Sequence, residues 1–281
     1  MTGLREQWLD LPAGRFRVLA REGQGAPIVF LHGLTATAEA WRPTIERLPV
    51  PAPPVFAFDQ RGHGHSPKPA SGYAVRDYVN DLLAVCAALS LERPHLVGHS
   101  MGGRVAIVAA ARYPSRFRSV AIVDIGPEAW RANWVETHEG LDALPDRYPT
   151  LDAAVEAVMP RRLPEGPGAP RPGELRAVAA GRFAVEPGGS ARWRADHAAL
   201  KHAVQIHRSR DYWRDWERIS IPALLIRGER SRELRPRIAD EMRRRNPRVH
   251  FEEVPGVGHN IPLFAPGVLA RLLTRSWRGA D

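Results

Sequence analysis

The stretch His95-Leu-Val-Gly-His-Ser-Met-Gly-Gly103 determines the fold that we expect for this chain. A short apolar run leads into a Gly-x-Ser-x-Gly motif centred on Ser100, and residues 104–112 follow it with apolar positions at helical spacing. In such a strand–turn–helix the serine occupies a strained turn, so the residues two before and two after it must be small. We therefore expect Ser100 to be a nucleophile above a sheet, with the backbone N–H of Met101 directed at a developing oxyanion.

Short apolar runs on both sides of this stretch alternate with helical patterns, which predicts an α/β fold with a mostly parallel sheet flanked by helices. The expected strands are residues 15–21, 27–31, 55–58, 95–98, 119–124, 223–227 and 249–254. The expected helices between them are residues 77–89 and 102–112.

The alternation stops at residue 126, and no strand pattern returns before residue 220. This region predicts helices only, at residues 129–144, 151–158, 174–185 and 192–217, with a Pro- and Gly-rich loop at 160–173. We therefore expect a core made of residues 1–125 and 221–281, with a helical cap, residues 126–220, inserted into it.

Two further segments offer the groups that a serine nucleophile needs. One expected strand ends in His32-Gly33, where the backbone N–H of Leu34 is the expected second donor to an oxyanion. The last expected strand runs into a glycine-rich loop that ends in His259. Imidazole titrates near neutral pH and can take the proton of a serine hydroxyl, so we expect His259 to be the general base.

These motifs, together with the loop Asp59-Gln-Arg-Gly-His-Gly-His-Ser66, resemble the α/β-hydrolase superfamily, in its lipase- and esterase-like branch with a helical cap. The resemblance covers nearly the whole chain. It implies a Ser–His–acid triad and no cofactor. In the relatives that are haloalkane dehalogenases or epoxide hydrolases, the nucleophile position holds Asp. Here that position holds Ser100, so the resemblance implies that neither activity is present.

The acid of the triad departs from the family's pattern. Most members place an Asp three or four residues beyond the glycine that ends the strand before the last, and here those positions hold Ser231 and Arg232. Asp124, after the strand that follows the nucleophile's helix, is the preferred candidate, because some relatives carry their acid there. Glu233 and Glu229 are the alternatives, and a chain that lacks the acid is a third possibility.

The charge and the hydropathy of the sequence limit the classes of binding partner that we expect. The formal net charge is +9, and residues 227–248 hold nine arginines against four acidic residues without a base-stacking motif, which predicts a solvated helix face and no nucleic-acid partner. No apolar run reaches the roughly 18 residues of a membrane span, and the start of the chain has no signal-peptide pattern. We expect no membrane partner and a cytoplasmic location.

Neither a disulfide nor a metal site is expected. Cys86 is the one cysteine, and its apolar surroundings predict a buried small side chain. His63 and His65 have no third ligand at fitting spacing, so no metal is expected.

The function favoured by these features is hydrolysis of a carboxylic ester or lactone through an acyl-enzyme. Carbon–carbon bond hydrolysis and cofactor-free perhydrolysis use nearly the same machinery and are alternatives, as is a ligand-binding protein with an impaired triad. Residues 126–220 hold 14 basic and 14 acidic residues and five of the eight tryptophans. We therefore expect a small, apolar and uncharged substrate.

Overall fold

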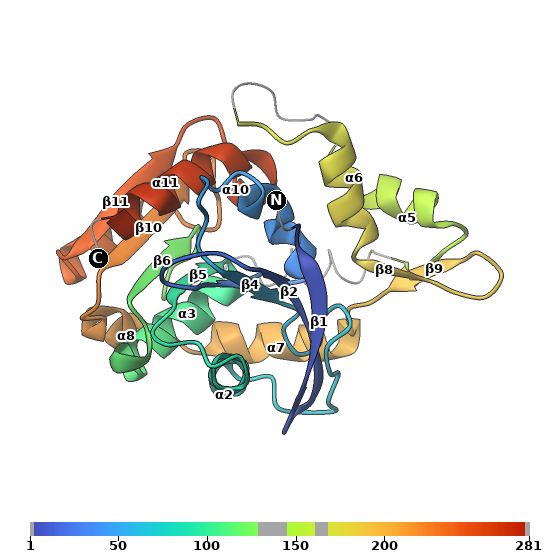
Figure 1. Ribbon diagram of the computed structural model, residues 1–281, viewed down its shortest axis with the longest axis horizontal. Coiled ribbons are helices and arrows are strands. Elements are labelled where there is room, and N and C mark those ends of the chain that lie inside the picture. The colour runs from blue at the N-terminus through green and yellow to red at the C-terminus, as the bar shows by residue number, and fades with distance from the viewer. Residues whose placement is uncertain (1–2, 129–144, 161–167, 279–281) are drawn as a thin grey trace.

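The computed structural model describes residues 3–128, 145–160 and 168–278, and its centre is an eight-stranded sheet with strand order β1-β2-β4-β3-β5-β6-β10-β11 (Figure 1). The strands are β1 (Arg5–Leu11), β2 (Gly14–Arg21), β3 (Ile28–Leu31), β4 (Val55–Phe58), β5 (His95–His99), β6 (Ser119–Val123), β10 (Ala223–Gly228) and β11 (Val249–Val254). The strands from β4 to β11 pair in parallel, and β1 and β2 are antiparallel additions at one edge. The expected α/β fold with a mostly parallel sheet is confirmed.

All seven expected strands form, and β1 is one that the sequence pattern did not predict. The half-buried positions of β1, Gln7, Leu9 and Leu11, alternate with exposed ones, but a polar residue at position 7 and an apolar Trp8 on the exposed face hide this alternation in the sequence. The central strands β3 and β5 are buried along their whole length, because helices cover both faces of a parallel sheet.

Two layers of helices cover the two faces of the sheet. On one face lie α2 (Val75–Ala88), α3 (Met101–Arg112), α8 (Trp213–Arg218) and α9 (Pro236–Arg245). On the other lie the 3-10 helix η1 (Ala38–Trp41), α1 (Arg42–Ile45), α10 (Ile261–Phe264) and α11 (Pro266–Arg278). A further 3-10 helix, η2 (Pro114–Arg116), leads into β6.

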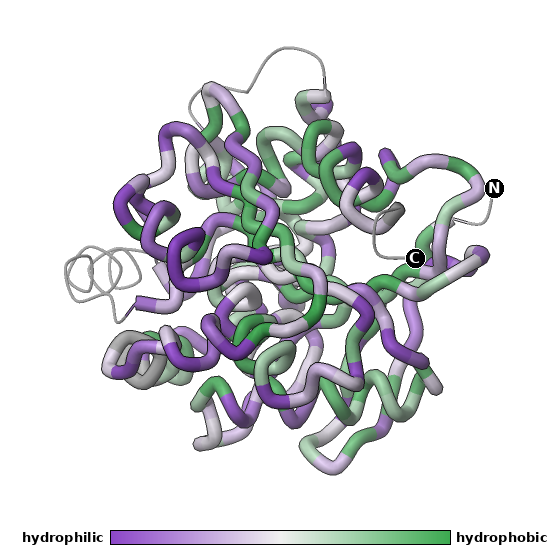
Figure 2. Tube along the Cα trace, turned by 90° about the vertical axis from the view of Figure 1, so that its left-hand side faces the viewer, coloured by the Kyte–Doolittle hydropathy of each residue, from purple (hydrophilic) through white to green (hydrophobic). Residues whose placement is uncertain are grey.

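Alternate strand residues enter alternate cores, as Leu96 and Val97 of β5 illustrate. Figure 2 shows hydrophobic and hydrophilic segments following one another along the chain. Cys86 of α2 is buried, as predicted, and burial raises the pKa of its thiol to about 12.

The residues between β6 and β10, here called the insertion, do not form helices alone. Their described elements are β7 (Arg147–Tyr148), α5 (Leu151–Val158), α6 (Pro172–Ala180), β8 (Phe183–Val185), β9 (Ala191–Trp193) and α7 (His197–Ser209), followed by α8. The three strands form a small antiparallel sheet with order β7-β9-β8, and it lies beside the main sheet (Figure 1).

The expectation that residues 126–220 contain no strand was wrong. The three strands are only two or three residues long, too short to show alternation, and a glycine-rich turn joins β8 to β9, where the Glu186 N–H donates to the Ser190 carbonyl at 2.8 Å. The helix expected at 151–158 is confirmed as α5. The one expected at 174–185 forms as α6 up to Ala180, and its last three residues form β8 instead. The one expected at 192–217 divides into β9, α7 and α8. The helix expected at 129–144 lies outside the described residues, as does part of the loop at 160–173.

The tryptophans of the insertion that can be described mostly serve packing. Trp216 of α8 is fully buried against α9, and its Nε1–H donates to the Met242 carbonyl at 2.8 Å. Trp193 packs with Tyr148 and Phe183 in an apolar cluster within the insertion. Trp213 lies beneath the guanidinium of Arg245, 4.5 Å from the ring centroid, and Trp130 and Trp134 lie outside the described residues.

The arginine-rich stretch around α9 is exposed and forms surface ion pairs. Arg243 pairs with Asp240, and Arg245 pairs with Glu241 and with Glu217 of α8. Across residues 3–128, 145–160 and 168–278, no helix is long and apolar enough to cross a membrane.

Candidate active site

Ser100 lies in a sharp turn between β5 and α3, with φ 53° and ψ −119°. A Cβ added at Gly98 would lie 2.3 Å from the carbonyl oxygen of Gly102, and one added at Gly102 would lie 2.4 Å from that of Leu31. Neither position can therefore carry a side chain. The close packing of strand and helix holds the serine in a left-handed conformation that an L-residue rarely adopts.

His259, in the loop after β11, connects Ser100 to Asp124. Its Nε2 lies 2.9 Å from Ser100 Oγ, and its Nδ1 lies 2.8 Å from Asp124 Oδ2. A carboxylate beside Nδ1 fixes the tautomer in which Nδ1 donates and Nε2 can accept the serine proton. The structure thus brings together three residues that the sequence places 24 and 135 positions apart, because β5, β6, β10 and β11 are neighbours in the sheet.

Asp124 directly follows β6, is fully buried and has φ 54°. Its Oδ1 accepts the backbone N–H of Gly228 at 2.8 Å, and its Oδ2 accepts the hydroxyl of Ser231 as well as His259 Nδ1–H. Hydrogen bonds to the charged form compensate a buried carboxylate for its lost hydration. These hydrogen bonds fix the orientation of the carboxyl group, with Oδ2 directed at His259.

The two glutamates proposed as alternatives occupy other positions. Glu229 is exposed, and its Oε2 accepts the N–H of Gly256 at 2.5 Å. Glu233 donates its backbone N–H to Ser231 Oγ at 3.1 Å. Of the three carboxylates that the sequence left open, Asp124 is the one that lies within hydrogen-bond distance of His259 Nδ1, and its role as the triad acid stays a prediction.

Ser231 is a site residue that sequence reasoning noted only as the absence of an acid. Its Oγ accepts the backbone N–H groups of Glu233 and Leu234, at 3.1 and 3.2 Å, so its own proton is left for Asp124. Arg227 holds this loop by donating to the carbonyls of Leu234 and Glu229 at 2.8 and 3.0 Å. The signal in the sequence was a hydroxyl at the position where most relatives carry the acid.

The two expected oxyanion donors lie on either side of Ser100. Met101 begins α3, so its N–H has no acceptor within the helix. A Cβ added at Gly33 would lie 3.2 Å from Ser100 Cβ, which places the backbone of the Leu34 loop against the nucleophile. Within the described part of the chain no acceptor engages the Leu34 N–H. Their role as an oxyanion hole stays a prediction.

Two buried histidines, which the sequence reading did not assign to the site, hold the Leu34 loop. His32 Nε2 accepts the N–H of Gln60 at 2.9 Å, and His32 Nδ1–H donates to the Gly33 carbonyl at 2.8 Å. His63 Nε2 accepts the N–H of Thr35 at 3.3 Å. Burial lowers the pKa of His32 to about 4 and that of His63 to about 3, so both rings are neutral at pH 7.

His99, the residue before the nucleophile, contacts both the backbone and the ring of His259. Its Nε2–H donates to the backbone carbonyl of His259 at 2.9 Å, and the two rings lie 4.7 Å apart. Burial, together with the neighbouring His259, lowers the pKa of His99 to about 3. His99 therefore holds the loop of the general base as a neutral ring.

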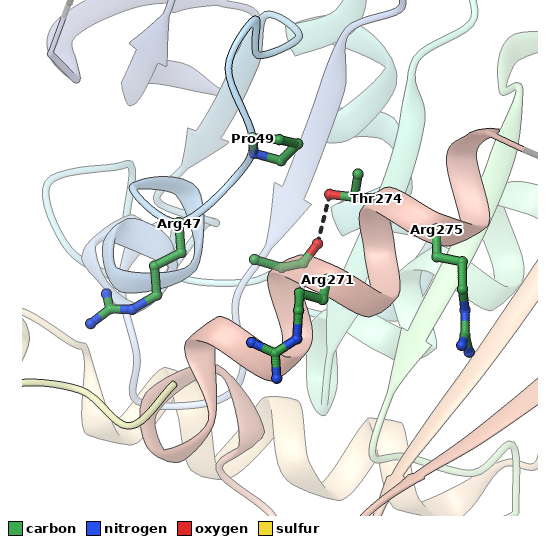
Figure 3. A pocket seen from close by; sticks show the side chains of 6 residues that line it. Arg47, Pro49, Arg271, Thr274 and Arg275 are labelled. Carbon is green, nitrogen blue, oxygen red and sulfur yellow. Dashed lines mark hydrogen bonds between the residues drawn. The ribbon is translucent and has the colours of Figure 1, made fainter. Parts of the chain in front are cut away.

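The described residues contain no group of three His, Cys, Asp or Glu side chains that could hold a metal ion. His65 packs edge-on against Trp8, away from the partners of His63. A hollow of about 300 Å³ lies between α11 and the segment that follows α1. Three arginines line it, Arg47, Arg271 and Arg275 (Figure 3). Their guanidinium groups do not converge, and two of them pair with carboxylates, so the hollow offers no comparable chemistry.

The comparisons with known proteins agree with this geometry. Residues 26–159 match the family model for the alpha/beta hydrolase fold. The chain is 32% identical over 268 residues to 2-(acetamidomethylene)succinate hydrolase of Mesorhizobium japonicum, which covers 93% of this chain and 91% of that protein. The chain therefore belongs to the alpha/beta hydrolase superfamily, as the resemblance predicted, and it is a hydrolase.

Solved structures extend this result. A crystal structure of E-2-(acetamidomethylene)succinate hydrolase superposes with a TM-score of 0.87 and 27% identity, over 98% of this chain and 99% of that one. The enol-lactonase of Burkholderia xenovorans superposes with a TM-score of 0.76 over 97% of this chain and 100% of that one, but at 18% identity it shows a shared fold alone.

Proposed function

We propose that this protein is a serine hydrolase that works through an acyl-enzyme. The observation that carries the proposal is the chain of hydrogen bonds from Ser100 through His259 to Asp124 at the end of a strained strand–helix turn. His259 Nε2 takes the hydroxyl proton as Ser100 Oγ attacks a carbonyl carbon, and the N–H groups of Leu34 and Met101 stabilise the oxyanion. His259 then donates that proton to the leaving group and activates the water that releases the acid.

The bond cleaved is, in this proposal, a carbon–carbon or carbon–nitrogen bond beside a carbonyl, in preference to an ester or lactone. The relative that matches most of the chain is named for a substrate with an acetamido group on a succinate, which contains neither an ester nor a lactone. This favours the alternative of carbon–carbon hydrolysis, extended to nitrogen leaving groups, over the ester or lactone first expected. Carbon and nitrogen leaving groups need a proton as they depart, and protonated His259 supplies it.

A panel of substrates with one common acetyl group tests this proposal. The kcat/KM for an N-acetyl enamide and for a 1,3-diketone should exceed that for ethyl acetate, an unactivated ester, and Ser100→Ala should abolish every activity. A fluorophosphonate should label the wild-type protein and the matched control Ser220→Ala, an exposed serine, but not Ser100→Ala. Labelling that survives in Ser100→Ala would contradict the nucleophile, and faster cleavage of the ester would contradict the leaving group.

The ligand-binding alternative loses its main support. It depended on a missing acid, and the hydrogen bond of 2.8 Å between His259 Nδ1 and Asp124 Oδ2 speaks against it. Perhydrolysis would use the same Ser100, His259 and Asp124 and stays an alternative.

A further inference from the structure

The helix α7 of the insertion begins on the loop that carries His63. The N–H of Asp196, the residue that caps α7, donates to the carbonyl of Gly62 at 3.0 Å. A Cβ added at Gly62 would lie 3.6 Å from Leu200 Cδ2, so a fully buried side chain of α7 packs beside the same turn. The insertion therefore rests on the residue that directly precedes His63.

The peptide unit between Gly62 and His63 is held from two sides. Its carbonyl accepts from Asp196 of the insertion, and its N–H donates to the carbonyl of Gln60 at 3.0 Å. Because a peptide unit is planar, these two bonds fix the direction in which the backbone enters His63. Gly62 has φ 79°, and a Cβ there would lie 2.8 Å from the ring of Tyr73, so this turn requires glycine. The position of His63 therefore depends on how α7 is seated.

The buried ring of His63 connects this turn to the backbone at Thr35. Its Nδ1–H donates to the carbonyl of Arg61 at 2.9 Å, which leaves Nε2 as the acceptor for the N–H of Thr35 at 3.3 Å. Thr35 has φ 60°, a conformation that costs a residue other than glycine roughly 1–3 kcal/mol and persists only where its surroundings hold it. The bond to His63 is one such support.

Two peptide units flank the backbone of Leu34, and a histidine holds each of them. In the first, the carbonyl of Gly33 accepts His32 Nδ1–H at 2.8 Å. The N–H of Leu34 belongs to the same trans peptide as that carbonyl and therefore points the opposite way. The second peptide unit carries the N–H of Thr35, which His63 holds. A change at His63 should thus turn the backbone around the expected oxyanion donor.

We infer that His63 is a positioning residue for the oxyanion donor at Leu34, and that α7 of the insertion sets its position through the carbonyl of Gly62. The donor lies close to the reacting atoms, because a Cβ added at Gly33 would lie 3.2 Å from Ser100 Cβ. Hydrogen bonds to an oxyanion act in the transition state, so the insertion influences kcat through them. This inference rests on the proposed function for the role of the Leu34 N–H.

Two substitutions at His63 separate its acceptor from its donor. Asn places an amide N–H near the position of Nδ1 and keeps the bond to Arg61, whereas Gln reaches the position of Nε2 and keeps an acceptor for Thr35. With the preferred substrate of the acetyl panel, His63→Asn should lower kcat by about 10- to 100-fold at constant KM, less than the loss of a whole oxyanion donor. His63→Gln should recover most of this loss. An unchanged kcat in His63→Asn, or a loss that His63→Gln does not reverse, would overturn the inference.

The link to the insertion is tested with Leu200→Ala, which removes the side chain beside Gly62. We expect kcat to fall by about 3- to 10-fold, an effect of the size that contacting residues exert on each other. In the double variant with His63→Asn, the loss should be smaller than the product of the two single losses, because both act on one set of contacts.

The matched control is Leu151→Ala, the same change in α5 within the insertion's own apolar cluster. Its effect should multiply independently with that of His63→Asn. Independent effects of Leu200→Ala and His63→Asn would overturn the inference, since α7 would then not act through His63.

Hydrogen exchange separates this inference from the proposed function, because it needs no turnover. The amides of residues 33–37 should exchange faster in His63→Asn and in Leu200→Ala than in wild type or Leu151→Ala. Unchanged exchange in β3 and β5 shows that a variant is folded, and Leu200→Ala reports the same contact if His63→Asn does not fold. Faster exchange at residues 33–37, in a protein that cleaves no substrate of the panel, would keep the positioning role and overturn the proposed function. Turnover together with unaltered exchange at these residues would overturn the inference alone.

Discussion

The carboxyl ends of the strands divide the site into two halves that are held in different ways. At the ends of β3, β4 and β5, the buried rings of His32, His63 and His99 hold the backbone around Ser100. All three are neutral at pH 7 because burial lowers each pKa to about 3 or 4. At the ends of β6 and β10, the buried carboxylate of Asp124 is held by three donors.

The difference shows that neutral side chains position the nucleophile, whereas a carboxyl group is placed beside the histidine. Neutral rings hold the nucleophile's half without placing a charge where an oxyanion develops. In the proposed mechanism, the carboxyl group of Asp124 in the acid's half faces the histidine that becomes positive during attack. Substitutions that change the charge of a side chain should therefore affect kcat and the free energy of unfolding differently in the two halves.

The largest effect is expected from Asp124→Asn. Asn keeps the size of the side chain but cannot stabilise an imidazolium and favours the wrong tautomer of His259, so kcat should fall by about 10⁴-fold, the effect of the same change in a protease triad. Steady-state kinetics on the preferred substrate measure it. The matched controls are Glu229→Gln and Glu233→Gln, which should stay near wild type. If either is inactive while Asp124→Asn works, the acid lies on the β10 loop.

A second variant tests whether the two strand ends are interchangeable. Asp124→Asn combined with Ser231→Asp moves the carboxylate to the β10 loop, where Ser231 already bonds the oxygen that accepts from His259. We expect the double variant to recover at least about 10²-fold in kcat over Asp124→Asn alone, a gain of roughly 3 kcal/mol in transition-state stabilisation. Activity no higher than that of Asp124→Asn would show that the site accepts an acid from β6 alone.

The half of the site that contains His32, His63 and His99 should be the first to lower the free energy of unfolding when the pH falls. A buried histidine whose pKa is lowered in the folded protein takes up its proton in the unfolded chain at about pH 6.5, so the unfolded state binds more protons below that pH. Each of His32, His63 and His99 should therefore cost about 2 kcal/mol of unfolding free energy between pH 6.5 and pH 5. This loss continues down to the folded pKa values of about 3 to 4.

Urea denaturation at several pH values measures this slope. His99→Gln, which keeps a donor for the His259 carbonyl but cannot titrate, should flatten the slope, and His250→Gln on the exposed part of β11 should not. A slope that His99→Gln leaves unchanged would contradict the neutral state of that ring.

The smallest effect is expected from Ser231→Ala, because it removes one of three donors to Asp124. We expect kcat to fall by about tenfold or less, KM to stay constant, and Ser231→Thr to recover most of the loss. A matching rise in KM would show that Ser231 contacts substrate instead of positioning the acid.

The sequence predicted the core of this protein because its signals there are local. The Gly-x-Ser-x-Gly motif requires close packing at two glycines, and buried parallel strands leave continuous apolar runs such as residues 28–31. The same local signals placed Ser100 and His259 at strand ends, and the order of the parallel strands brought Asp124 beside them.

What the sequence could not show depends on contacts between distant segments. The role of Ser231 exists only because β10 pairs with β6, and the pairing of Phe183 with Trp193 needs a hairpin whose strands are too short for a periodic signal. His32, His63 and His99 look like ordinary polar residues in sequence, and only their burial identifies them as neutral supports.

The insertion leaves and rejoins the sheet at neighbouring strands. The N–H of Asp124 at its start donates to the carbonyl of Ile226 in β10 at 2.8 Å. The cost of closing a loop rises by only about 0.6 kcal/mol when its length doubles, so segments of very different size can be exchanged between these two strands. Descendants of such a chain can thus change the substrates they accept while inheriting the reaction, provided that each new segment returns to the same pair of strands.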